Sequence, residues 1–138
     1  MTLKVMLDDF AIRPARAYPD DAGLDIYTPK YIIVPAGGSV TVNTGVHVAI
    51  PRGYVGMLKS TSGLNVKFGL TNEGVIDSGY TGAINVKLYN HSDRDVPLII
   101  GRKISQLVIL PIITPEIQIV DSLPATPRGD NGFGSTEA

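Results

Sequence analysis

The sequence predicts an all-β protein of one domain, built from short strands as a sandwich or barrel. Three observations support this fold class. Apolar or threonine side chains recur at every second position from Val40 to Ile50, as in half-buried strands. Glycine and proline punctuate the chain at intervals of roughly eight to twelve residues, which is typical of turns between short strands. The only plausible helix, Ser62–Phe68, spans one or two turns, with Thr61 or Ser62 as its cap.

The alternating stretch predicts a pair of strands with a break near Asn43-Thr44-Gly45. Further short strands are predicted at Leu3–Leu7, Tyr31–Val34, Tyr54–Leu58, Ala83–Tyr89, Leu98–Ile100, Ile104–Ile113 and Glu116–Val120. Ile104–Ile113 is almost entirely apolar, so we expect it to be buried on both faces. Burial on two sides in so small a chain indicates a subunit interface.

The bulk composition excludes several classes of function. The 138 residues carry 12 basic and 13 acidic side chains, so no positive surplus attracts nucleic acid, and no nucleic-acid partner is expected. The absence of cysteine excludes disulfides and thiolate chemistry and favours a cytoplasmic location, of the cell or a host cell. His47 and His91 have no close cluster of acidic or histidine neighbours, which argues against a zinc site. Neither a signal peptide nor a long apolar run indicates a membrane partner.

Four polar, glycine-containing segments interrupt the strands. They are "DAGLDIY" at 21–27, "KSTSGLN" at 59–65, "NEGVIDSGYTGAINV" at 72–86 and "RGDNGFGSTEA" at 128–138. Taken singly, each has a structural explanation: Asp25 can be a turn residue, Ser62-Gly63 a helix cap, and Asp77–Tyr80 a β-hairpin turn. The arginine-glycine-aspartate triplet at 128–130 matches an adhesion ligand, but a triplet matches by chance often.

Taken together and in this order, the segments resemble the five motifs of the trimeric dUTP pyrophosphatase (dUTPase) family. "AGLDIY" is similar to the first motif, "SGL" to the second, "GVIDSGYTG" to the third, "GRKISQLV" to the fourth and "RGDNGFGST" to the fifth. The resemblance spans essentially the whole chain, and the third and fifth motifs are the most specific. It implies a distorted jelly-roll-like β-barrel domain at 1–127 that assembles as a homotrimer with shared active sites. A flexible C-terminal arm, 128–138, is expected to be exchanged between subunits and to close the active site.

The resemblance also implies an activity, the hydrolysis of dUTP to dUMP and pyrophosphate, which limits uracil in DNA and supplies dUMP. Asp77 stands where the family has the general base that activates a water beside the α-phosphorus. Tyr80 matches the tyrosine that packs under the deoxyribose and excludes a 2′-hydroxyl. Uracil is expected to be read by backbone groups of the hairpin near Gly74 and Asn85, whose fixed donors and acceptors match its edge. Val75 and Ile76 belong to the same binding segment.

The triphosphate is expected to contact the remaining motifs. Ser62 and Gly63 offer backbone N–H groups and a hydroxyl at the start of the helix, and Gln106 matches a phosphate-contacting glutamine. Mg²⁺ would be carried on the phosphates, with Asp25 holding its waters. The arm residues that the resemblance assigns to substrate binding are Arg128, Phe133, Gly134, Ser135 and Thr136. Among these, Phe133 would cover the uracil, while the arginine and the hydroxyls hold the outer phosphates.

The sequence departs from the family pattern at two positions. Thr61 replaces the arginine that usually precedes the Ser-Gly of the second motif, which removes a cationic fork. Lys59 could compensate for the missing arginine if the strand continues and places both positions on the same face. Thr71 is at a position that often contacts the nucleotide in the family. Arg102 replaces an aspartate of the fourth motif, which is expected to alter a structural ion pair and not the chemistry.

Two other functions compete with this interpretation. dCTP deaminase resembles the same fold and shares the "GVID…G" segment, but that family needs a glutamate as proton shuttle where this chain has Lys87. The second is a non-catalytic or regulatory β-barrel that binds nucleotide without releasing pyrophosphate. Assay of pyrophosphate release separates both from a dUTPase.

Overall fold

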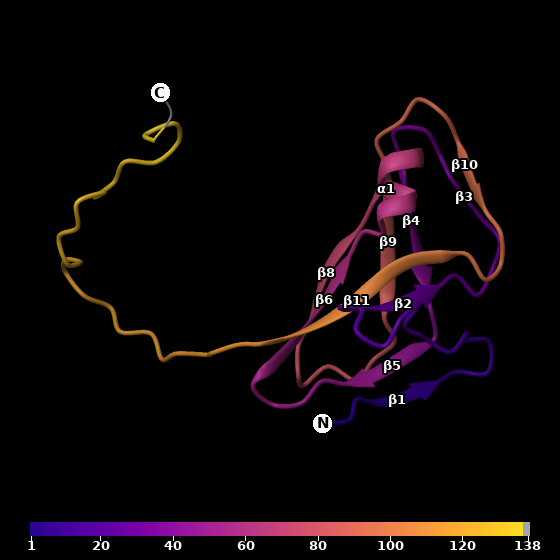
Figure 1. Ribbon diagram of the computed structural model, residues 1–138, viewed down its shortest axis with the longest axis horizontal. Coiled ribbons are helices and arrows are strands. Elements are labelled where there is room, and N and C mark those ends of the chain that lie inside the picture. Colours follow the sequence, from indigo (N-terminus) through magenta and orange to yellow (C-terminus); the bar gives the residue numbers. More distant parts are fainter. Residues whose placement is uncertain (137–138) are drawn as a thin grey trace.

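The computed structural model describes residues 1–136 and has eleven strands and one helix (Figure 1). The strands are β1 (Lys4–Leu7), β2 (Gly23–Tyr27), β3 (Ile32–Val34), β4 (Ser39–Asn43), β5 (Val46–Ala49), β6 (Tyr54–Lys59), β7 (Leu70–Thr71), β8 (Glu73–Ile76), β9 (Asn85–Asn90), β10 (Val96–Leu98) and β11 (Lys103–Pro111). The helix, α1 (Ser62–Phe68), lies between β6 and β7. The all-β class with one very short helix is therefore confirmed.

The strands form four antiparallel sheets, in the orders β2-β11-β6-β8, β4-β9-β7, β1-β5 and β10-β3. Neighbours in a sheet are mostly distant in sequence, as in a jelly-roll-like barrel. Within residues 1–136, no helix has the length and apolar character needed to cross a bilayer.

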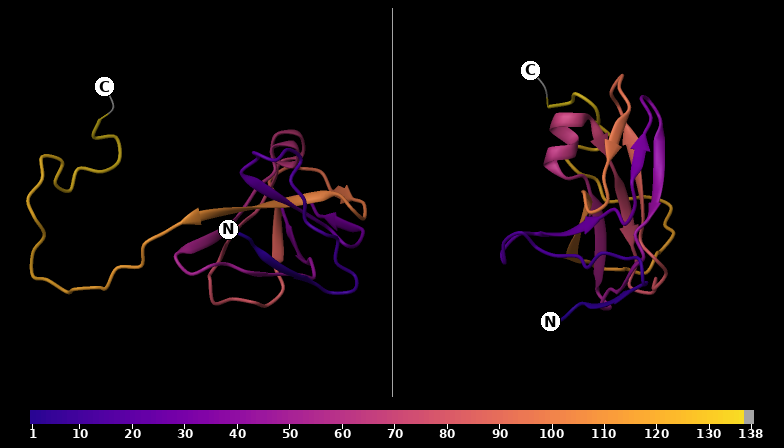
Figure 2. Two further views of the ribbon diagram at one scale, coloured as in Figure 1. Left: turned by 60° about the horizontal axis from the view of Figure 1, so that its bottom comes forward. Right: turned by 90° about the vertical axis from the view of Figure 1, so that its right-hand side faces the viewer.

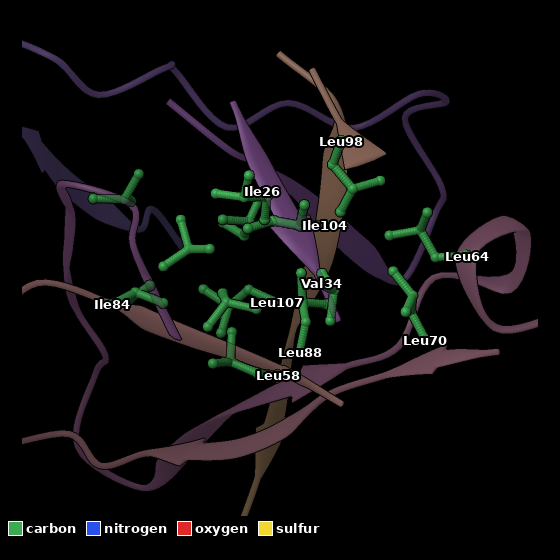
Figure 3. Close-up of a cluster of buried hydrophobic side chains, with 14 of the residues drawn as sticks. Ile26, Val34, Leu58, Leu64, Leu70, Ile84, Leu88, Leu98, Ile104 and Leu107 are labelled. Atoms are coloured by element: carbon green, nitrogen blue, oxygen red, sulfur yellow. The ribbon is translucent and has the colours of Figure 1, made fainter. Parts of the chain in front are cut away.

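The sheets enclose one apolar core (Figure 3). Ile26, Leu88, Ile104 and Leu107 have no exposed surface, although they come from three different strands. Leu64 is the buried residue of α1, and it fastens the helix to the end of this core. Burial of such side chains is the main stabilising term of the barrel, at about 1.5–3 kcal/mol for each.

The alternating stretch forms two strands, β4 and β5, as expected. Their buried side chains follow the period of two, and Gly45, at φ 68°, makes the break between them. A Cβ added at Gly45 would lie only 2.7 Å from the Phe10 ring, so a side chain there would also collide with Phe10. The two strands do not pair with one another, however: β4 pairs with β9 and β5 with β1. The chain therefore crosses from one sheet to another at this break.

The helix at Ser62–Phe68 and its cap at Thr61 are confirmed. Thr61 has extended backbone, and its side chain makes no capping hydrogen bond. The helix ends at Gly69, whose left-handed conformation at φ 70° lets its N–H donate to the carbonyls of Asn65 and Leu64. This short helix fixes where the Ser62-Gly63 backbone points.

Three strand predictions need correction. Glu116–Val120 forms no strand, because it has no partner among residues 1–136 and all its residues are exposed. The strand predicted at Leu98–Ile100 lies at Val96–Leu98, and Ile99 and Ile100 are exposed in the following turn. Ile104–Ile113 is not buried on both faces: β11 is buried around Leu107 but exposed from Leu110 onward.

Sequence reasoning also missed strands inside the polar segments. β2 lies within "DAGLDIY", and β8 within "NEGVIDSGYTGAINV". Polar and glycine residues hid their alternation, since β2 carries Asp25 on a buried position and β8 contains Gly74. Both of these strands therefore bring motif residues onto the rigid four-stranded sheet.

After β11 the chain leaves the barrel and extends far from it (Figures 1 and 2). Every described residue from Leu110 to Thr136 is exposed, including Ile117 and Ile119 at about nine-tenths of their surface. The departure begins well before residue 128, so the division of the chain at 127/128 stays a prediction. Residues 137 and 138 of the predicted arm lie outside the described part.

Candidate functional site

Asp77 and Tyr80 line one cleft of about 260 Å³, which we call the Asp77 cleft. Its walls are Val75, Ile76, Asp77, Tyr80, Ala83 and Asn85. The Tyr80 N–H donates to the Asp77 carbonyl at 3.0 Å, which closes a β-turn, and the Tyr80 hydroxyl donates to the Ala83 carbonyl at 2.7 Å. The turn thus presents an exposed carboxylate beside an aromatic ring whose hydroxyl is already engaged.

The turn at Asp77–Tyr80 is confirmed, but the strands beside it are not a hairpin. β8 pairs with β6, whereas β9 pairs with β4 and β7, so residues 77–84 bridge two sheets. β8 is the outermost strand of its sheet. One side of its backbone therefore has no neighbouring strand, and the N–H and C=O groups around Gly74 and Val75 are available to a ligand.

A second cleft, of about 270 Å³, collects residues of the first, second and fourth motifs; we call it the Asp25 cleft. Its lining comprises Ala17, Asp21, Ala22, Gly23, Asp25, Thr61, Ser62, Lys103 and Gln106. β11 lies between β2 and β6, and Gln106 is directly opposite Asp25 on β2 and Lys59 on β6. The topology therefore brings three sequence segments to one place.

The Asp25 carboxylate is largely buried and pairs with the Lys103 ammonium at 3.0 Å. Sequence reasoning did not identify Lys103 as its partner. Within residues 1–136, no group of three or more histidine, cysteine, aspartate or glutamate side chains could hold a metal ion. The cleft holds two carboxylates, Asp21 and the already paired Asp25. They are too few for a full set of direct ligands, so a cation fits here as an outer-sphere contact.

The Gln106 side chain is held in place on two sides. Its Nε2 donates to the Ser60 carbonyl at 2.9 Å, so the half-buried amide has the partner that the sequence led us to expect. Its other face lies against Gly23, where an added Cβ would overlap the Gln106 amide. Gly23 is therefore required by the close approach of this side chain.

A buried polar network behind Gln106 was missed by sequence reasoning. The Ser105 hydroxyl donates to Asn72 Oδ1 at 2.6 Å, and Asn72 Nδ2 donates to the Ile104 carbonyl at 3.0 Å. The Asn72 N–H in turn donates to the Ser60 hydroxyl at 3.0 Å. These bonds fasten the Ser60 loop, which leads into Ser62 and Gly63. The only sequence signal was a serine inside an apolar strand.

Lys59 and Thr71 lie outside the Asp25 cleft. Both line a separate cleft of about 480 Å³, where Lys59 pairs with Glu73 at 3.4 Å and the Thr71 hydroxyl is 2.7 Å from Nε2 of His91. β6 ends at Lys59, so the strand does not continue to Thr61. The condition under which Lys59 would compensate for the missing arginine is not met.

Arg102 stacks its guanidinium over the Phe68 ring, with 5.6 Å between the guanidinium carbon and the ring centroid. Within residues 1–136 it forms no ion pair. The replacement of the usual aspartate therefore puts a cation–π contact at the end of α1. It lies outside the linings of the Asp77 and Asp25 clefts.

The Asp77 and Asp25 clefts lie at opposite ends of the β6–β8 pairing. Asp77 follows Ile76, which pairs with Gly56, whereas Ser62 comes three residues after Lys59, which pairs with Glu73. Strands rise about 3.3 Å per residue, so the paired stretch alone separates the two ends by about 10 Å. Motif residues that the sequence led us to expect in one site are thus divided between two places on this chain.

The described arm residues, 128–136, line neither cleft. Arg128 donates from Nε to the Asn131 carbonyl at 2.9 Å, and the Ser135 N–H donates to the Gly132 carbonyl at 3.1 Å. Gly134 adopts φ 75°, and Phe133 is fully exposed. Every hydrogen bond of the segment 126–135 described here is local, so this chain does not itself bring the fifth motif to the other four.

The fold and these clefts define a jelly-roll-like β-barrel whose polar site is divided along the chain. The dUTPase family model matches residues 9–137. The chain is 42% identical over 131 residues to the probable deoxyuridine 5'-triphosphate nucleotidohydrolase of Schizosaccharomyces pombe, with 94% of each chain covered. It is 41% identical to the deoxyuridine 5'-triphosphate nucleotidohydrolase of Yarrowia lipolytica, covering 99% of this chain and 89% of the relative.

Solved structures agree with these relatives. A Staphylococcus bacteriophage 80alpha dUTPase mutant with dUpNHpp superposes with a TM-score of 0.90 at 30% identity, over 99% of both chains. A mutant dUTPase from phage phi11 of S. aureus, whose description concerns the coordination of a structural Mg(II) ion, superposes with a TM-score of 0.82 at 31% identity, over 88% of this chain and 98% of that one. The chain belongs to the dUTPase family.

Proposed function

We propose that this protein hydrolyses dUTP to dUMP and pyrophosphate, limiting uracil in DNA and supplying dUMP. The observation that carries the proposal is the Asp77 cleft, where an exposed carboxylate lies beside Tyr80 and the free edge of β8. Membership of the family and the names of the relatives support it. Lack of cysteine supports a cytoplasmic site of action, of the cell or a host cell.

In this proposal Asp77 is the general base. Among residues 1–136 its carboxylate forms no ion pair, so it is free to accept a proton from a water placed at the α-phosphorus. Attack by that water breaks the bond to the bridging oxygen, and pyrophosphate leaves. A positioned base of this kind contributes about 10²–10⁴-fold to the rate.

Base and sugar recognition would come from the same cleft. The free N–H and C=O groups of β8, from Gly74 to Ile76, and the neighbouring Asn85 offer fixed donors and acceptors to the edge of uracil. Cytosine carries a donor where uracil has an acceptor, so it would leave buried groups unpaired. The Tyr80 hydroxyl already donates to Ala83, so the ring would present its apolar surface to the sugar and select deoxyribose.

The phosphates would be held in the Asp25 cleft by the Ser62 and Gly63 backbone and by Gln106, which the Ser60 carbonyl orients. Mg²⁺ would be carried by the phosphates, with Asp25 contacting its waters. When bound, the ion offsets phosphate charge during the displacement. Lys103 supports an indirect role for Asp25, because it already compensates that carboxylate.

The proposed assembly is a homotrimer with shared active sites. Since the Asp77 and Asp25 clefts lie apart on one chain, a neighbouring subunit would supply the second half of each site. An exchanged arm explains the exposed Ile117 and Ile119, which need a neighbour to be covered. A further cleft, of about 540 Å³, lies along the exposed strand β1 and combines apolar side chains with Arg13 and Arg16. Beside it, β1 offers a second copy a free strand edge.

Residues 128–136 would then act as a cover that becomes ordered when the nucleotide binds. Fixing each backbone residue costs about 1–2 kcal/mol, whereas each charge-assisted hydrogen bond returns about 1.5–3 kcal/mol. The arm therefore needs several contacts at once: Arg128, Ser135 and Thr136 on the outer phosphates, Phe133 over the uracil, and Gly134 close to the backbone of the site. Closure would expel water and align the α-phosphorus.

The test is pyrophosphate release from dUTP compared with dTTP, dCTP and UTP, each with Mg²⁺. Rapid release from dUTP and slow release from the other three is the expected result. Tight binding of dUTP without release would replace the proposal with a non-catalytic nucleotide-binding barrel. Ammonia from dCTP would indicate a deaminase, but Lys87, which stacks on Tyr89 at 5.2 Å, does not provide that family's carboxylate.

A further inference from the structure

His47 links the N-terminal strand to the turn that carries Asp77 and Tyr80. The residue lies on β5, directly opposite Met6 of β1. Its Nδ1 is 2.8 Å from the Thr81 carbonyl, and its Nε2 is 3.1 Å from both carboxylate oxygens of Asp8. We call Asp8, His47 and Thr81 the histidine clamp. It was not found from the sequence, since Asp8 and His47 are 39 positions apart.

The two contacts of the ring require two protons. The Thr81 carbonyl and the Asp8 carboxylate are both acceptors, so each needs an N–H from the ring. A neutral imidazole has one N–H, whereas the imidazolium has two. Both hydrogen bonds of the clamp therefore form only while His47 is protonated.

Asp8 is itself held in place, which makes it a fixed anchor. Its N–H donates to the Gly45 carbonyl at 2.9 Å, and its carbonyl accepts from the Ala11 N–H at 2.9 Å. The Phe10 ring lies against Gly45, so close that a Cβ added there would overlap it. The clamp thus connects the turn to a segment that is already fastened to the β4–β5 break.

The turn has few other restraints in its middle. Its end is anchored at the buried Ile84, whose N–H donates to the Val46 carbonyl at 2.8 Å. Apart from the His47 contact, the hydrogen bonds of the residues between Ile76 and Ile84 come from within the turn or from Asn85 directly after it. His47 is thus the side chain from another strand that holds Thr81, the neighbour of Tyr80.

We propose that His47 is a positioning residue for the proposed reaction and that its loss of a proton releases the turn carrying Asp77 and Tyr80. The inference rests on the proposed function, because it assigns a purpose to that turn. Asp8 is the charged group in contact with the ring. Lys4 of β1 lines the same cleft as His47, of about 210 Å³. The titratable groups on the turn itself are Asp77 and Tyr80.

The direction of the pH effect follows from the contacts. The hydrogen bond to the Thr81 carbonyl, and after it the one to Asp8, raises the pKa of His47 above its ordinary value of 6.5. A raised folded-state pKa means that the clamp is complete below about 6.5 and is lost as pH rises through the folded-state pKa. The turn is therefore held on the acid side of the raised His47 pKa and released as pH rises above it.

The experiment measures kcat and KM for dUTP from pH 5.5 to pH 9 in wild type, His47→Gln, Asp8→Asn and Asp9→Asn. We expect the wild-type KM to rise about threefold to tenfold across the titration of His47, as one charge-assisted hydrogen bond is lost. His47→Gln removes this step, because glutamine does not titrate, and Asp8→Asn moves it to lower pH. Asp9→Asn, a neighbouring carboxylate without a recorded bond to the ring, keeps the wild-type profile.

Proton NMR on the His91→Gln variant, which retains one histidine, gives the His47 pKa without depending on activity. A value above the ordinary range supports the clamp, and Asp8→Asn in that background should lower it. An unchanged KM profile in His47→Gln, or an ordinary His47 pKa, overturns the clamp alone. If instead Asp77→Asn keeps full turnover, the proposed function of the turn fails, whatever His47 does.

Discussion

The Asp77 cleft and the Asp25 cleft are built in opposite ways. The Asp77 cleft lies on a turn between two sheets, and its carboxylate is exposed and forms no ion pair within the described chain. In the Asp25 cleft two polar side chains already have partners: Lys103 pairs with Asp25, and the Ser60 carbonyl accepts from Gln106. An unpaired carboxylate suits proton transfer, whereas a satisfied network suits the fixed geometry of a binding surface.

This difference predicts that substitutions in the two clefts change different kinetic constants. Losing the base should lower kcat while binding persists, because the proton is transferred in the transition state. Loosening the Asp25 cleft should mainly raise KM.

Asp77→Asn should have the largest effect. The amide has the shape of the carboxylate but cannot accept the proton, so kcat should fall by about 10²–10⁴-fold. Affinity for a non-hydrolysable dUTP analogue, measured by calorimetry, should stay close to that of wild type. Near-normal turnover would remove Asp77 from the role of base.

Deletion of residues 128–138 should reduce kcat/KM by about 10²-fold or more, since several charge-assisted contacts are lost together. The oligomeric mass in solution should not change, because the deleted segment begins after the exposed apolar residues at 112–123. Kinetics with light scattering on the same sample makes the measurement. Full activity after the deletion would mean that the fifth motif does not cover the site.

Gly23→Ala should raise KM by about tenfold, because the new methyl group occupies the place of the Gln106 amide. The matched control is the double variant Gly23→Ala/Gln106→Gly, because the Gln106 Cβ would itself lie 2.9 Å from the new methyl carbon. If the methyl group acts through Gln106, the double variant should be no worse than Gln106→Gly alone. Additive losses would show that Gly23 matters for a different reason.

Thr61→Arg should have the smallest effect, a KM lowered by a few-fold or a modest gain in activity, as a cation is returned to the Asp25 cleft. Thr61 is nearly buried but lines that cleft, so a longer side chain has an exit into it. Thr61→Gln supplies length without charge and should give no gain. A loss in both kinetic constants would indicate that this site is arranged without the cation.

The local features of the fold could be predicted from the sequence, but the pairing of its strands could not. Alternation located β4 and β5, and the capping pattern located α1. Which strand pairs with which depends on contacts between distant residues. The sequence therefore predicts a hairpin turn at Asp77, whereas the turn in the structure joins two sheets. Glu116–Val120 has strand-like alternation but no partner within this chain, and alternation alone cannot provide one.

The candidate site shows the same limit. The motifs identified Asp77 and Tyr80 in one cleft, and Asp25, Ser62 and Gln106 in the other, because motif order along a chain is visible in its sequence. The partners of these residues were not visible, since Lys103 meets Asp25 and Asp8 meets His47 only after folding. The polar network of Ser105 and Asn72 is long-range for the same reason.

The most direct test of the divided site is complementation between two inactive variants. Asp77→Asn and the 128–138 deletion are each expected to be nearly inactive, but a shared site can take Asp77 from one subunit and the arm from another. Coexpression in equal amounts should restore about a quarter of the wild-type rate if subunits mix at random in a closed ring. Activity no higher than that of the two variants measured separately would contradict a site shared between subunits.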